Sequence, residues 1–136
     1  MKDYFKAVGK IHYAPPREKL KKTRVADDNF LIIDFPNDIG VYYRHWVKKQ
    51  FGLFLNPPAY GCHITVLDGR NNIDEAYTHN WGKHLGRSIC LYYSPEIYQH
   101  WKFWCLPIVS DDVKMIRREL GFFDEKPLHV TVGRML

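Results

Sequence analysis

The chain has 136 residues, of which 46% are hydrophobic, 26% charged and 15% aromatic, and its formal net charge is +5. This size and composition predict a single domain over residues 1–136 that buries its own core, and they exclude a mini-protein that needs disulfides or metals for stability. No apolar run approaches the roughly 18 residues of a membrane span, and the first ten residues lack the apolar stretch of a secretory signal. The mild positive charge suits an anionic ligand.

The first half of the chain predicts two strands, a helix and a third strand. Runs of apolar and β-branched residues mark the strands, and apolar residues three or four positions apart mark the helix. Asn37 or Asp38 can cap that helix and Gly52 can close it. In chain order the elements are a short strand at Gly9–Tyr13, a buried strand at Asn29–Phe35, a helix up to Gly52, and a strand that begins at His63 after the stiff turn Asn56–Gly61.

The second half predicts a similar order of elements. Residues 73–86 are polar and indicate a short helix and a loop. The run Ser110-Asp111-Asp112 can cap a later helix that Gly121 ends, and the apolar residues of this helix again follow helical spacing. In chain order the elements are a strand at Ser88–Tyr93, an aromatic-rich strand at Ile97–Val109 with Pro107 at an edge or bulge, the helix after Ser110, and a strand that contains His129. Strands with helices packed against them predict an α+β fold.

Residues Arg17–Arg24 form the strongest charge cluster of the chain. Two interpretations stay open for it. A run of charges is typical of a solvated loop or helix end. It also suits docking of nucleic-acid phosphates.

The three cysteines, Cys62, Cys90 and Cys105, are odd in number and lack C-x-x-C spacing. This pattern predicts neither a disulfide framework nor a zinc site, and it fits the reducing cytoplasm. We therefore expect a cytoplasmic protein with no metal, no other cofactor, no membrane segment and no obligate protein partner.

Two four-residue strings nearly repeat, as His-Ile-Thr-Val at 63–66 and His-Val-Thr-Val at 129–132. With seven histidines and four threonines in the chain, chance placement gives only about 0.2 His-x-Thr pairs. Residues two apart on a strand share a face, so each histidine lies beside its threonine and opposite the apolar neighbours. If the two strands are adjacent, two imidazoles and two hydroxyls face one shared groove.

Such a set of side chains can cleave a phosphodiester. Because histidine titrates near neutral pH, one of His63 and His129 can act as base on water or a ribose hydroxyl while the other protonates the leaving oxygen. Thr65 and Thr131 can donate hydrogen bonds to the equatorial phosphate oxygens. Which histidine is the acid stays open. Two histidines without carboxylates at ligand spacing make a poor zinc site, so no metal is expected.

Other chemistries find less support in the sequence. Phosphate-loop, dinucleotide-binding, zinc-protease and nucleophile-elbow motifs are absent from it. A thiol nucleophile at Cys62 is disfavoured, since it faces away from His63 on a strand. A purely structural interpretation also stands, in which both histidines are buried, lie far apart and belong to a subunit of an assembly.

The duplicated motif, with Pro57–His63 leading into its first copy, resembles the 2H phosphoesterases. This family includes 2′-5′ RNA ligase-like proteins, cyclic phosphodiesterases and phage enzymes that destroy cyclic-oligonucleotide signals. The resemblance covers the eight motif residues and the order of elements. It implies a bilobal α+β fold with two antiparallel sheets facing a central groove and helices packed on the outside.

The resemblance also implies an activity, the metal-independent hydrolysis of a nucleotide or RNA-end phosphodiester. A 2′,3′-cyclic phosphate and a cyclic oligonucleotide are the expected substrate types. The implied catalytic residues are His63, Thr65, His129 and Thr131.

Three aromatic residues are candidates for stacking on a base of the substrate, although packing in the core is the default interpretation for each ring. They are Tyr13, Tyr60 and Trp104. The alternative function is a non-catalytic RNA- or nucleotide-binding module of the same fold, which the basic cluster Arg17–Arg24 favours.

Overall fold

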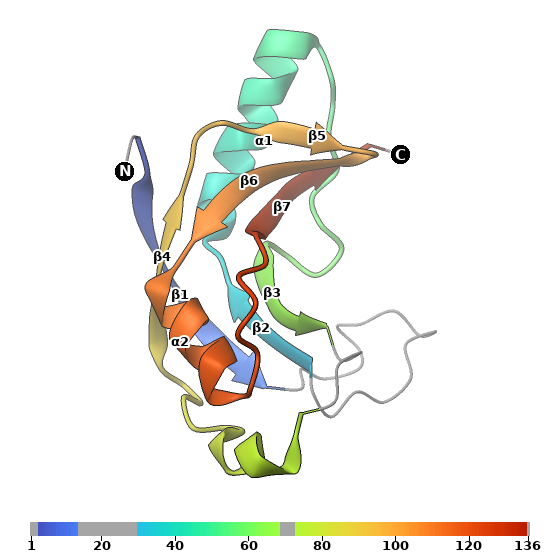
Figure 1. Cartoon of the computed structure of the whole chain (residues 1–136). Coiled ribbons are helices and arrows are strands. Elements are labelled where there is room, and N and C mark those ends of the chain that lie inside the picture. The colour runs from blue at the N-terminus through green and yellow to red at the C-terminus, as the bar shows by residue number, and fades with distance from the viewer. Residues whose placement is uncertain (1–2, 14–29, 69–72, 136) are drawn as a thin grey trace.

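The computed structural model describes residues 3–13, 30–68 and 73–135. Figure 1 shows strands that wrap around one another, with a helix on either side. The basic cluster Arg17–Arg24 lies outside the described residues. The elements are β1 (Phe5–Tyr13), β2 (Phe30–Asp34), α1 (Asn37–Phe51), β3 (His63–Asp68), the 3₁₀ helix η2 (Glu75–Asn80), β4 (Ser88–Tyr93), β5 (Tyr98–His100), β6 (Phe103–Val109), α2 (Asp111–Glu119) and β7 (Leu128–Arg134).

The described strands pair in the order β4-β1-β2-β3-β7-β6-β5, and their pairings are antiparallel. A further pairing between β4 and β6 closes six of them into a barrel, while β5 extends the edge of β6. The predicted α+β class is confirmed. The strands form a single sheet, so the expected arrangement of two sheets in two lobes is not confirmed.

The barrel consists of two similar halves. β1, β2 and β3 form one half, with α1 between β2 and β3 in the chain; β4, β6 and β7 form the other, with α2 between β6 and β7. The pairs β1–β4 and β3–β7 join the halves. The coarse duplication expected from the sequence is therefore present as a repeated order of elements.

The core lies inside the barrel because alternate residues of each strand point inward. Ile33, Ile64, Leu106 and Val130 are fully buried there. Their neighbours along the strands point outward and are less buried. The alternation thus separates an apolar interior from an outer face that can carry polar chemistry.

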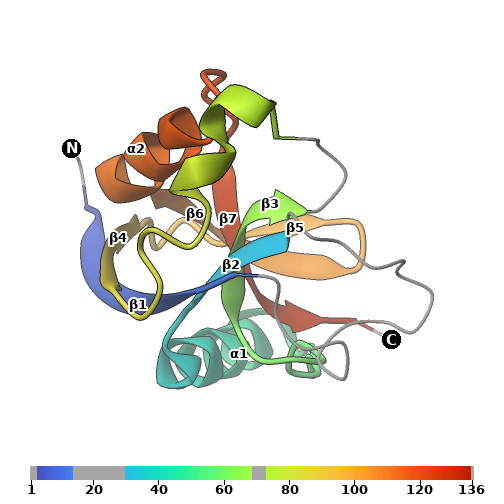
Figure 2. The ribbon, with the colours of Figure 1, turned by 90° about the horizontal axis from the view of Figure 1, so that it is seen from below.

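The two helices cover the barrel on opposite sides of the strands (Figure 2). α1 packs against β7 and α2 against β4. Gly52 ends α1 in a left-handed conformation with φ +69°, as predicted, and the Ser110 hydroxyl caps α2 by accepting a hydrogen bond from the Val113 amide at 3.1 Å. None of the described helices combines the length and the apolar character needed to cross a bilayer.

The predicted cap of α1 is wrong in detail. Pro36 holds the N-cap position, and no side chain caps the helix there. The Asn37 side chain instead accepts a hydrogen bond from the Cys62 amide at 3.0 Å. Asn37 therefore ties the start of α1 to the residue that precedes β3.

The segment predicted as one strand at Ile97–Val109 is a hairpin of β5 and β6. The chain reverses at Trp101, whose φ is +56°, and Lys102. Pro107 lies where β6 changes its partner from β5 to β4, and its carbonyl accepts a hydrogen bond from the Ser94 amide at 3.0 Å. A residue without an amide hydrogen is tolerated there because the ladder on that side is interrupted.

Gly9 should be indispensable to the barrel. A methyl group at this position would overlap the carbonyl oxygen of Asp34 and approach the Ile33 side chain to 2.8 Å. We expect Gly9→Ala to lower the free energy of unfolding by about 1–3 kcal/mol, because the two strands must separate. Chemical denaturation measures this, with Lys10→Ala on the exposed neighbour as control. Equal stability of both variants would contradict the packing described here.

Candidate active site

The two His-x-Thr strands are neighbours in the barrel. β3 pairs antiparallel with β7, and Ile64 stands opposite Val130. Both of these side chains are fully buried inside the barrel. The residues on either side of them in each strand must point to the outer face.

The register brings the four motif residues together on that outer face. Extending it by one residue in each direction places His63 opposite Thr131 and Thr65 opposite His129. Directly opposed side chains lie about 5 Å apart at Cβ, and diagonal ones about 7–8 Å. The two imidazoles are diagonal neighbours, a spacing that allows both to reach one tetrahedral phosphate.

His63 has a defined orientation. Its Nδ1 lies 3.1 Å from the Gly61 carbonyl oxygen. A carbonyl only accepts hydrogen bonds, so Nδ1 carries the proton that it donates. Nε2 is then the nitrogen left to act on a ligand.

The turn before β3 fixes where His63 begins. Gly61 has φ +80°, a conformation that side-chain-bearing residues rarely adopt. Its amide donates to the Pro58 carbonyl at 3.2 Å, and the Cys62 amide donates to the Asn37 side chain. The Cys62 carbonyl in turn accepts from the Phe35 amide at 3.0 Å. Three backbone contacts thus hold the two residues that precede His63.

His129 has an unusual electrostatic setting. His129 is exposed on the outer face of β7, yet its pKa lies below the ordinary value of 6.5. Desolvation by the surrounding protein atoms lowers the pKa most, and the charges of His100 and His63 lower it further. The mutual influence agrees with the close approach of His63 and His129 expected from the register. His129 is therefore mainly neutral at pH 7 and can accept a proton.

The threonines differ in their neighbours. Thr131 pairs with Cys105 of β6, and its hydroxyl lies 3.7 Å from the thiol. The Cys105 thiol is buried, and burial raises its pKa more than the contact with Thr131 lowers it. It stays a neutral thiol. Thr65 pairs with Ile32 of β2 and is partly exposed. Both hydroxyls can therefore donate to an anion on the outer face.

A histidine–carboxylate pair lies beside the motif residues. Asp34 of β2 is the register partner of His63. The Oδ2 atom of Asp34 lies 2.5 Å from His12 Nε2. Both side chains are largely exposed, so their pairing adds little to stability. Titratable groups consequently extend from β1 across β2 and β3 to β7.

The β5–β6 hairpin supplies groups that sequence reasoning missed. His100 comes close enough to His129 to affect its pKa. Trp101 is 74% exposed at the turn, and the Lys102 ammonium lies 4.7 Å from the centre of its ring. Tyr98 and His100 are two positions apart, so the sequence indicates that they share one face of a strand. Because the segment is predicted as one long strand, the turn that brings His100 toward β7 is not predicted.

The predicted base-stacking residues are placed differently from one another. Tyr60 is 45% exposed in the turn before β3. Trp104 is buried on the inner face of β6, where its ring packs 5.6 Å from that of Phe51. Tyr13 lies on the opposite face of β1 from His12 and packs edge-on against Trp81. The structure brings neither Trp104 nor Tyr13 to the motif histidines.

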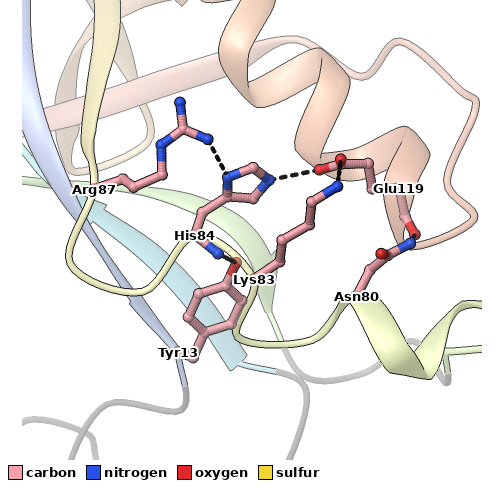
Figure 3. A network of polar contacts seen from close by, with 6 residues as sticks. All are labelled: Tyr13, Asn80, Lys83, His84, Arg87 and Glu119. Carbon is pink, nitrogen blue, oxygen red and sulfur yellow. Dashed lines mark hydrogen bonds and ion pairs between the residues drawn. The ribbon is translucent and has the colours of Figure 1, made fainter.

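Tyr13 belongs to a second polar cluster, shown in Figure 3. Its hydroxyl accepts a hydrogen bond from the His84 amide at 3.2 Å. His84 is buried, with Nε2 2.6 Å from Glu119 and Nδ1 2.7 Å from Arg87. Burial raises the pKa of Glu119, but hydrogen bonds from Lys83 and His84 outweigh it and leave the pKa lowered. Both nitrogens of His84 are occupied, so this cluster ties the loop before β4 to α2 and offers no free acid or base.

Cys62 is not placed for nucleophilic chemistry. The residue is 4% exposed and points inward, away from His63. Burial raises the pKa of its thiol, although the Arg44 guanidinium opposes the shift. The expectation that Cys62 and His63 face opposite sides is therefore confirmed.

Comparison with protein-family models, with curated proteins and with solved structures finds no match to this chain.

We expect the imidazole of His129 to titrate below pH 6.5, and His100→Asn to raise its midpoint by removing one of the repelling charges. Because desolvation is the larger cause, the midpoint should recover only in part. The unfolded chain binds this proton more readily, so His129 costs stability as the pH falls below about 6.5 and contributes nothing above it.

Imidazole NMR across pH 4–9 measures the midpoint. The matched control is His45→Asn, which changes an exposed histidine on α1. A midpoint of His129 at or above 6.5, or equal responses to the two variants, would contradict the proposed proximity.

Proposed function

We propose that this protein is a metal-independent phosphodiesterase of the 2H type that acts on a nucleotide phosphodiester. The observation that carries the proposal is the pairing of β3 with β7 at Ile64 and Val130. It puts two imidazoles and two hydroxyls on one outward face. In this proposal the two halves of the barrel correspond to the two lobes of the 2H fold.

The reaction divides between the two histidines. His129, whose pKa is lowered, takes a proton from the attacking water. The new bond forms between that water oxygen and phosphorus, and the bond to the leaving oxygen breaks. His63 gives a proton from Nε2 to the leaving oxygen, while Nδ1 stays bonded to the Gly61 carbonyl. Exchange with solvent then restores both imidazoles.

The threonines act on the charge that the phosphorane carries. Each lies next to the histidine of the other strand, Thr131 opposite His63 and Thr65 opposite His129. Their hydroxyls donate to the non-bridging oxygens and hold the phosphorus between the two rings. No step in this scheme requires a metal.

The substrate class follows from the neighbouring surface. The exposed Trp101 ring offers a stacking face for a base, and Lys102 above it supplies a positive charge for a phosphate. Tyr60 is a second exposed ring near the start of β3. A 2′,3′-cyclic phosphate or a cyclic oligonucleotide combines the base and the phosphodiester that these groups suit.

The alternative is a non-catalytic nucleotide- or RNA-binding module. The same exposed Trp101 and Lys102 favour it, because base stacking and phosphate contact need no proton transfer. Tight, salt-sensitive binding of an oligonucleotide without product would support this alternative.

Replacing either motif histidine should remove the activity. We expect His63→Ala and His129→Ala each to lower kcat/KM by about 10²–10⁴-fold, because each loses one proton-transfer partner. The substrates to compare are 2′,3′-cyclic nucleotides, cyclic di- and trinucleotides and linear dinucleotides. EDTA should have no effect.

His45→Ala, on the exposed side of α1, is the matched control for these substitutions. Circular dichroism confirms that each variant is folded. Activity within tenfold of the unmodified protein in both motif variants would end the proposal.

The pH profile tests the assignment of base and acid. With His129 as base, kcat/KM should rise along an acidic limb centred below pH 6.5, since the base must be neutral. His100→Asn should move that limb to higher pH and leave the alkaline limb in place. Movement of the alkaline limb instead would show that His129 is the acid.

A further inference from the structure

A separate aromatic cavity lies at the end of the barrel that faces the start of α1. Its volume is about 380 Å³. It forms between the beginning of β1, the end of β4 and the first turns of α1, and its lining residues are Phe5, Asp38, Ile39, Tyr42, Tyr43 and Tyr93. Phe5 and Tyr93 are register partners on the inner face of β1 and β4, whereas the motif histidines lie on the outer face. The cavity is therefore independent of the candidate active site.

The aromatic rings that line this cavity contact one another, several of them edge-to-face. Tyr42 and Tyr43 stand at 86° with centroids 5.0 Å apart, and Tyr43 and Tyr93 at 87° with centroids 6.3 Å apart. Phe5 extends the wall at 5.6 Å from Tyr93. Rings set at right angles present several negative faces to one open cavity, an arrangement that attracts organic cations in proteins.

The polar side-chain groups on the described lining of the cavity are all oxygens. In the part of the chain that the structure describes, no hydroxyl of Tyr42, Tyr43 or Tyr93 has a hydrogen-bond partner within the protein. The hydroxyl oxygens of Tyr43 and Tyr93 are not among the buried polar atoms left unpaired, so both remain accessible in the cavity. Burial, followed by its neighbours Tyr93 and Tyr42, raises the pKa of Tyr43 to about 12. Burial, followed by Asp38 and Tyr42, also raises the pKa of Tyr93. The phenols of Tyr43 and Tyr93 are thus neutral acceptors at physiological pH.

Among the lining residues that the structure describes, Asp38 is the only one with a formal charge. One of its carboxylate oxygens, Oδ1, accepts a hydrogen bond from the Ile39 amide at 3.0 Å. Across residues 3–13, 30–68 and 73–135, the carboxylate has no cationic partner. Asp38 and Tyr93 line the same cavity, and the Asp38 charge contributes to the raised pKa of Tyr93.

The geometry points to a binding site for an alkylated ammonium group in this cavity, with Asp38 balancing its charge. Perpendicular aromatic walls attract a diffuse cation, and the carboxylate adds a direct ion pair. A neutral apolar ligand would desolvate Asp38 without compensation. A small divalent cation would find one carboxylate, far fewer ligands than it prefers.

Choline and its uncharged isostere 3,3-dimethylbutan-1-ol form the decisive pair of probes. Both have the same shape, and only choline carries a charge. Titrated at constant ionic strength with NaCl, choline should shift the ring resonances of Tyr42 and Tyr93 and bind at least about fivefold more tightly than the isostere. Equal affinities, or no shift of these resonances, would overturn the proposal.

Substitutions test which residues form the site. Asp38→Asn keeps the size of the side chain and removes its charge, and Tyr42→Ala removes a ring that is 61% exposed. Each should weaken choline binding by about fivefold or more. Asp111→Asn, in the first turn of α2, and Tyr92→Ala, on the other face of β4, are the matched controls. Losses of equal size in the controls would overturn the proposal.

The ammonium group can belong to a free small molecule or to a methylated lysine side chain. A short peptide with one trimethyllysine distinguishes these sources. Tighter binding of the peptide than of choline identifies the side chain, and tighter binding of choline identifies the free molecule. Failure of both probes would overturn the proposal, whatever the phosphodiesterase assays show.

Discussion

The antiparallel contact between β3 and β7 is the constraint on which the candidate site depends. Ile64 and Val130 face each other inside the barrel because both side chains are apolar and are excluded from water. Because Ile64 and Val130 point into the barrel, the polar residues next to them in each strand must point to the outer face. A slip by one residue would turn these polar groups into the core, so hydrophobic burial itself sets the register of the motif.

Much of this arrangement could be predicted because strand periodicity is a local signal. His63 and Thr65 alternate with apolar neighbours, and His129 and Thr131 repeat the pattern, so their shared face follows from the sequence alone. The cap of α2 could also be predicted locally within Ser110-Asp111-Asp112, and in the structure Ser110 holds that position. That the two strands are adjacent depends on the duplication of the elements around them.

Other features could not be predicted because they depend on register across the barrel. The sequence does not show which face of its strand Trp104 occupies. Its pairing with Gly133 places it on the buried inner face of β6. Tyr13 packs against Trp81, a residue far from it in the sequence, and so does not face the motif histidines. The chain reverses at Trp101 without the glycine, asparagine or proline that usually marks a tight turn. The sequence pattern of β5 and β6 therefore reads as one continuous strand.

The pairing of β3 with β7, one of the two places where the halves of the barrel join, has a consequence for folding. His63 and His129 stand 66 positions apart in the chain, yet one ladder of backbone hydrogen bonds separates them. Neither half of the barrel alone contains both imidazoles, because His63 is on β3 and His129 on β7. The two imidazoles are therefore neighbours only while β3 and β7 stay paired, and any opening of this pairing would separate them and expose Ile64 and Val130 as well.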